Sequence, residues 1–101
     1  MVRTSQAIID HDRVADICER NDITYLGLFG SFARSEATTT SDVDLLVRFR
    51  TPKSLLDLIR IEREFSERLG RPVDLVTENA LSPYLKERVL AEAREIYEIS
   101  G

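Results

Sequence analysis

The most constraining feature of the sequence is a glycine–serine pair followed, after ten residues, by two aspartates separated by one apolar residue. Gly30 and Ser31 end the short apolar run of residues 25–29, and Asp42 and Asp44 open a second apolar run. A brief apolar run followed at once by glycine predicts a buried strand that ends in a tight turn. The chain is therefore expected to carry a tight turn and a pair of carboxylates at the ends of two buried strands.

The remaining elements follow from apolar periodicity and from residues that start or stop helices. Helices are expected at residues 11–21, 54–69 and 82–97, with a short one at 32–36, and strands at 25–29, 43–49 and 73–76. The expected apolar stripes are Val14, Ile17 and Cys18 in the first helix, Leu55, Leu58, Ile59, Phe65 and Leu69 in the longest, with Ile61 on its flank, and Leu85, Val89, Ala93, Ile96 and Tyr97 in the last. This order predicts an α/β (α+β) fold with a small mixed three-stranded sheet and helices packed on one face. No linker or repeat divides the chain, so residues 1–101 are expected to form a single domain.

Composition restricts the class of protein. With 43% hydrophobic and 32% charged residues, the chain resembles an ordinary soluble globule. A net charge of −4 argues against a broad electrostatic grip on nucleic acid. Cys18 is the only cysteine, which excludes an intramolecular disulfide and favours a packing role. The sequence has neither a signal-peptide pattern nor a membrane-length apolar run, so a cytoplasmic protein is expected.

The two aspartates indicate a metal site. Side chains alternate faces along a strand, so Asp42 and Asp44 are expected to point the same way. Two adjacent anions repel, and a divalent cation such as magnesium relieves that repulsion while also binding phosphate oxygens. The alternative is an exposed edge whose paired acids serve only solubility.

The glycine–serine turn indicates a phosphate site. Gly30 lets the backbone adopt a left-handed turn close to a ligand, and Ser31 offers a hydroxyl next to a helix N-terminus. Arg34 and Ser41 complete the predicted nucleotide-binding set, although Arg34 could equally pair with a neighbouring acid. Arg48 and Lys53 are expected to be solvated.

A third carboxylate comes from the last predicted strand. Asp74 is the one polar residue of Val-Asp-Leu-Val, where an unpaired carboxylate is costly unless it faces a site or a cation. It is therefore expected to join Asp42 and Asp44 as a metal ligand and catalytic group. A structural salt bridge is the alternative for this residue.

These motifs resemble the minimal nucleotidyltransferases (MNT) of the DNA polymerase β superfamily. The likeness covers nearly the whole chain. It includes Val-Asp-Leu-Val at 73–76 and Ser-Pro-Tyr-Leu-Lys-Glu-Arg-Val-Leu at 82–90, which are similar to MNT antitoxins encoded beside HEPN ribonucleases. The resemblance implies a polymerase-β-like fold. It also implies that Gly30 and Ser31 bind phosphate and that Asp42 and Asp44 bind magnesium. Asp74 would bind a second metal or accept the proton of the nucleophile.

The resemblance also implies a function, namely transfer of AMP from ATP to a tyrosine of a HEPN-type toxin. One position departs from the family, because Ser35 stands where glycine usually follows Ala-Arg. Weaker binding of the nucleotide is therefore an open alternative. The rival hypothesis is a non-catalytic antitoxin that neutralises its partner by occlusion. Transfer to a small molecule would normally need a further substrate domain. Self-association stays open, through the apolar face of the last helix or a sheet edge.

Overall fold

A computed structural model describes residues 11–31, 33, 36 and 42–99 of the chain. Its centre is a mixed four-stranded sheet in the order β3-β2-β1-β4. Strand β2 (Val43–Phe49) pairs with β1 (Ile23–Phe29) antiparallel and with β3 (Val73–Thr77) in parallel. The α/β class and the mixed sheet are confirmed, but the sheet has four strands rather than three.

Strand β2 divides its side chains between the two faces of the sheet. Val43, Leu45 and Val47 lie in the main hydrophobic core, at 0 to 1% exposure. Alternation sends the residues between them to the opposite face, and these include Asp44. The predicted bounds of this strand are confirmed, because a short, mostly apolar run is a local signal.

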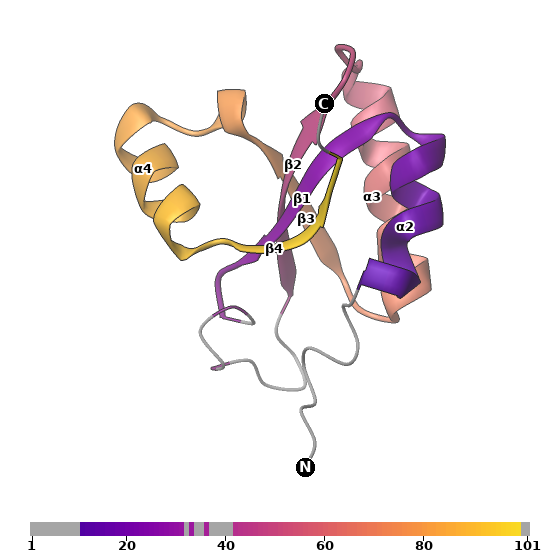
Figure 1. Ribbon diagram of the computed structural model, residues 1–101, viewed down its shortest axis with the longest axis horizontal. Coiled ribbons are helices and arrows are strands. Elements are labelled where there is room, and N and C mark those ends of the chain that lie inside the picture. The colour runs from indigo at the N-terminus through magenta and orange to yellow at the C-terminus, as the bar shows by residue number, and fades with distance from the viewer. Residues whose placement is uncertain (1–10, 32, 34–35, 37–41, 100–101) are drawn as a thin grey trace.

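Two helices cover the core face of the sheet (Figure 1). Helix α2 (His11–Arg20) buries Val14, Ile17 and Cys18, as the sequence predicts. Helix α3 (Leu55–Leu69) has Ser54 as a capping-box N-cap, and Gly70 ends it in the left-handed conformation at φ 71°. No helix in the described part of the chain is long and apolar enough to cross a membrane.

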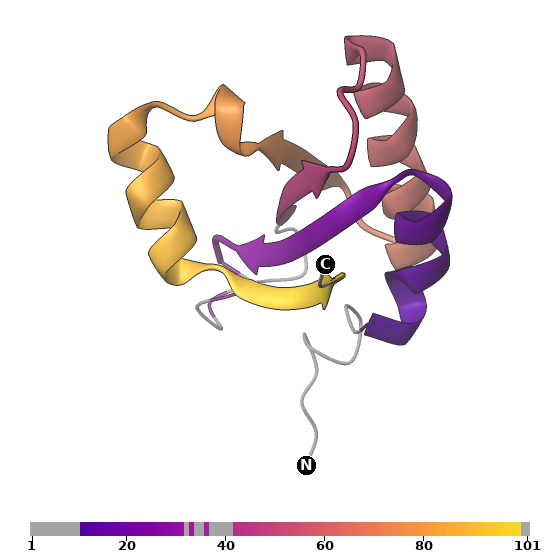
Figure 2. The ribbon, with the colours of Figure 1, turned by 45° about the horizontal axis from the view of Figure 1, so that its top comes forward.

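The buried stripe of α3 differs from the prediction. Phe65 and Leu69 are buried, but so is Ile61, which the sequence placed on the flank. Leu55 is 72% exposed and Ile59 is 45% exposed, so both predicted core positions are wrong. Helices α2 and α3 are in contact, but the first turn of α3 reaches past the end of α2 (Figure 2). Helix α2 therefore does not cover that turn.

The last predicted helix is also wrong in its second half. Helix α4 (Pro83–Glu92) starts with the predicted Ser82 cap and Pro83 but ends at Glu92. Arg94–Glu98 then form β4, an edge strand antiparallel to β1. Tyr97 is buried from this strand, against the same core that α2 covers.

Helix α4 lies on the other side of the sheet from α2 and α3 (Figures 1 and 2). None of its residues is buried. The prediction that the helices share one face therefore holds for α2 and α3 and not for α4.

The outer edge of β3 is closed by side chains of α3. The carboxylate of Glu62 accepts a hydrogen bond from the Leu75 N–H at 2.8 Å, and the Ser66 hydroxyl oxygen accepts one from the Val73 N–H at 3.0 Å. Unpaired edge groups invite pairing with another chain. These two contacts satisfy two of the N–H groups of β3 that point away from β2.

Replacing Glu62 tests this edge closure. We expect Glu62→Ala to lower the free energy of unfolding by about 1–3 kcal/mol, because the partly buried Leu75 N–H loses its acceptor. Urea unfolding followed by circular dichroism measures the change. Glu67→Ala, at an exposed position of the same helix, is the matched control, and an equal loss in both variants would contradict the edge role.

A second prediction concerns the contact between α2 and α3. Arg68 donates hydrogen bonds of 2.7 and 3.0 Å to the Asp16 carboxylate, and this contact holds the pKa of Asp16 well below its ordinary value. A lowered folded-state pKa stabilises the fold above the unfolded-state pKa, and that contribution is lost as the pH falls toward the folded-state value. Asp16→Asn should therefore lower the melting temperature at pH 7, and the difference from wild type should shrink below about pH 4. A difference that stays constant from pH 7 to pH 2 would refute the pairing.

Candidate functional site

Asp44 lies between the two other predicted parts of the site. Its parallel neighbour in β3 is Asp74, and its antiparallel neighbour in β1 is Phe29, the residue before Gly30. Paired residues of adjacent strands present their side chains on the same face. The structure therefore brings Asp44 next to Asp74 on one side and next to the glycine turn on the other.

Asp42 and Asp74 are the more exposed members of the predicted triad. Asp42 stands one residue before β2, where the Val43 N–H bonds the Pro72 carbonyl at 2.9 Å. Asp74 is exposed and forms no salt bridge with any described residue, which weighs against the structural alternative for it. Within the described ranges, no three acidic, histidine or cysteine side chains are gathered closely enough to hold a metal ion. The strand pairing thus sets Asp44 beside Asp74, and Asp42 lies just before the start of β2.

Gly30 is required by both its conformation and its surroundings. Its φ is 77°, in the left-handed region that favours glycine. The Asp44 carboxylate also occupies the position that a Cβ on residue 30 would need. The predicted left-handed turn is thus present, and its close approach is to Asp44.

The turn continues through Ser31 toward the core. Ser31 is half-buried, and its carbonyl accepts a hydrogen bond from the Glu36 N–H at 2.8 Å. Ala33, two residues further on, is buried in the core. Arg34, Ser35 and Ser41 lie outside the described residues, as does most of the predicted short helix.

Glu92 joins the site without having been predicted. Its carboxylate oxygen Oε1 accepts a hydrogen bond from the Gly30 N–H at 3.2 Å. The two residues are 62 positions apart. No local motif marks such a contact, and the predicted continuous helix would have carried the end of the chain away from β1.

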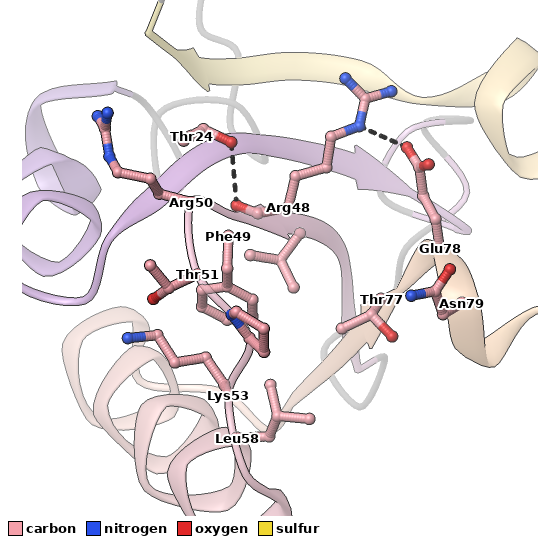
Figure 3. A pocket seen from close by; sticks show the side chains of 12 residues that line it. Thr24, Arg48, Phe49, Arg50, Thr51, Lys53, Leu58, Thr77, Glu78 and Asn79 are labelled. Atoms are coloured by element: carbon pink, nitrogen blue, oxygen red, sulfur yellow. Dashed lines mark hydrogen bonds and ion pairs between the residues drawn. The ribbon is translucent and has the colours of Figure 1, made fainter.

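A pocket of about 580 Å³ lies at the opposite end of the sheet (Figure 3). Its basic residues are largely paired, since Arg48 bonds Glu78 at 2.5 Å and Lys53 lies 3.3 Å from Asp22. The Arg48 guanidinium also stacks on the Tyr25 ring at 4.8 Å. Arg48 and Lys53 therefore do not face the acidic pair. Both are expected from the sequence to be solvated; the Arg48 side chain is 47% exposed, but the Lys53 side chain is only 17% exposed and is paired with Asp22.

The acidic pair and the turn fit a magnesium–phosphate complex. Magnesium is usually held by one or two carboxylates together with phosphate oxygens, so a complete cage of protein ligands is not required. Asp44 and Asp74 offer carboxylates from adjacent strands, and Ser31 offers a hydroxyl donor at the neighbouring turn. The donor set is of the hard oxygen type that magnesium prefers.

Comparison with known proteins agrees with this geometry. The family described as Polymerase beta, Nucleotidyltransferase matches residues 12–100. A Methanocaldococcus jannaschii protein named "Putative protein adenylyltransferase MJ0435" is 43% identical over 84 residues, which are 83% of this chain and 90% of that protein. Protein adenylyltransferase MntA of Thermococcus cleftensis is 40% identical over 77 residues, covering 76% of this chain and 78% of that protein.

The fold is shared with solved toxin–antitoxin structures. One of them holds a tri-AMPylated Shewanella oneidensis HEPN toxin in complex with an MNT antitoxin. It superimposes with a TM-score of 0.71 at 17% identity, over 95% of this chain and 74% of the other. With the family match over most of its length and the two close relatives, the chain belongs to the polymerase β nucleotidyltransferase family.

Proposed function

We propose that this protein is an antitoxin that transfers AMP from ATP to a tyrosine hydroxyl of a HEPN-type toxin, with magnesium bound between the phosphate oxygens of ATP and carboxylates drawn from Asp42, Asp44 and Asp74. The observation that carries the proposal is the position of Asp44, which lies beside Asp74 and against Gly30 at once. Metal-binding and phosphate-binding groups are thereby adjacent on one face of the sheet. The names of the relatives and the toxin–antitoxin complex support the acceptor class.

The reaction would be an in-line displacement at the α-phosphorus. The tyrosine oxygen forms the new bond to phosphorus, the bond from phosphorus to the leaving pyrophosphate breaks, and the phenolic proton passes to the Asp74 carboxylate. Magnesium would neutralise the charge that develops on the phosphate oxygens. Asp42 and Asp44 would hold the magnesium beside the turn, and the Ser31 hydroxyl would donate a hydrogen bond to the departing phosphates.

The surroundings of the site suit a protein acceptor. Asp74 is exposed, so a side chain from another molecule can reach it. On the same side of the sheet, α4 exposes Tyr84, Leu85 and Leu90. Exposed apolar groups beside a site favour contact with another protein. We propose that the toxin presents its tyrosine across this surface.

Removing a carboxylate tests the metal assignment. Asp44→Asn, and the double variant with Asp42→Asn, should lower AMP transfer at least about 100-fold, because the carboxylates that would hold the magnesium, and through it the phosphates, are lost. Labelled ATP and mass spectrometry of the toxin tyrosines measure the transfer. Asp22→Asn is the control, since it removes a carboxylate at the other end of the sheet and asparagine tolerates the φ of 60° there.

Full transfer by the double variant would remove the metal assignment. Equal neutralisation of the toxin with and without ATP and magnesium would favour the occluding antitoxin instead.

The glycine turn can be tested against a matched glycine. Gly30→Ala forces a Cβ against the Asp44 carboxylate at a positive φ, so both AMP transfer and stability should fall. Gly70 has a similar φ of 71° but no neighbour within 4 Å of its would-be Cβ. Gly70→Ala should therefore cost about 1 kcal/mol of stability, from backbone strain alone, with transfer unchanged. Unfolding curves and rates of AMP transfer are measured for both variants. An equal loss of transfer in Gly30→Ala and Gly70→Ala would refute the role of the Gly30–Asp44 contact.

A further inference from the structure

Glu92 contacts the glycine turn at a different group from Asp44. The Asp44 carboxylate packs against the Cα of Gly30, where a side chain would stand. The Glu92 carboxylate accepts the Gly30 N–H in a partly buried hydrogen bond. One residue of the turn is thus fixed by two side chains from different elements.

The position of Glu92 follows from the pairing of β4 with β1. Gly27 pairs with Glu95 and Leu28 with Arg94, and a register shift lies just before Gly27. Continuing that antiparallel register by two residues sets Glu92 opposite Gly30. The strand register therefore brings Glu92 close to Gly30, and the Glu92 side chain completes the contact.

Among the described residues, helix α4 makes few other contacts with the rest of the protein. None of its side chains is buried, and Lys86 lies 3.8 Å from Glu78 in an ion pair. Glu92 is its last residue, so the hydrogen bond joins the end of α4 directly to the turn. A displacement of the end of α4 would therefore move the acceptor of the Gly30 N–H.

We propose that Glu92 is a positioning residue of the Gly30–Ser31 turn, and that it couples the placement of α4 to the capacity of the turn to hold a triphosphate. This inference rests on the proposed function. Its physical content is the acceptor that the Glu92 side chain offers to the Gly30 N–H. Glutamine keeps an oxygen acceptor at the same distance from the backbone, whereas alanine removes the acceptor.

The test compares Glu92→Ala and Glu92→Gln with wild type in two measurements. Hydrogen exchange of the Gly30 amide, followed by NMR, reports the contact without any nucleotide. The dissociation constant for magnesium–ATP, measured by calorimetry, reports the consequence. Glu92→Ala should speed Gly30 exchange and raise the dissociation constant on the order of fivefold, the size of one lost hydrogen bond. Glu92→Gln should stay within about twofold of wild type in both.

Two further variants separate positioning from charge and from helix stability. Glu87→Ala removes a carboxylate from an exposed position of α4, and Val89→Ala loosens a half-buried position near the end of the same helix. Glu87→Ala should leave Gly30 exchange and ATP affinity as in wild type, whereas Val89→Ala should shift both in the same direction as Glu92→Ala but by less, because the acceptor remains. An effect of Glu87→Ala equal to that of Glu92→Ala would overturn the proposal.

The outcomes distinguish the two proposals. Wild type that binds no magnesium–ATP would end the proposed function and the coupling with it. Wild type that binds it while Glu92→Ala leaves the affinity or the Gly30 exchange unchanged would end the coupling alone. In AMP transfer, the same defect should appear in the KM for ATP more than in kcat, because the turn is expected to act on nucleotide binding.

Discussion

The contact between Asp44 and Gly30 is the constraint on which the rest of the site depends. Asp44 comes from the central strand, and its carboxylate fills the space beside a glycine at the end of the neighbouring strand. A shift of one residue in the β1–β2 register would turn Asp44 toward the core and Leu45 away from it. The buried Val43, Leu45 and Val47 oppose that shift. Hydrophobic burial on one face thereby fixes the position of the acidic group on the other.

Much of this arrangement could be predicted because its signals are local. The apolar run of β2, the Ser54 cap and the Gly70 stop of α3 each depend on neighbouring residues only, and the structure places them as predicted. Helical periodicity located α3 but misjudged its buried face. Leu55 and Ile59 fit the stripe, yet only tertiary placement decides which turns of a helix are covered.

The second half of the last predicted helix failed for a different reason. Val89, Ala93 and Ile96 recur at helical steps, and Arg94–Glu98 also suits a strand. Pairing with β1 decides between the two, and that pairing joins residues about seventy positions apart, which no local pattern reports. The same error hid Glu92, because its place opposite Gly30 exists only once β4 is recognised.

The distribution of charge along β2 suggests how a nucleotide would meet this protein. Asp42, Asp44 and Asp74 lie at one end of the strand pair, and Arg48 and Lys53 lie at the other, where Glu78 and Asp22 pair with them. A free triphosphate would be repelled by the acidic end, whereas the same triphosphate bound to magnesium carries less negative charge. At physiological salt such repulsion acts over about 8 Å, so it is felt only at the site itself. The acidic end would therefore favour the metal complex over the free nucleotide, which is the selectivity that the proposed metal-dependent transfer requires.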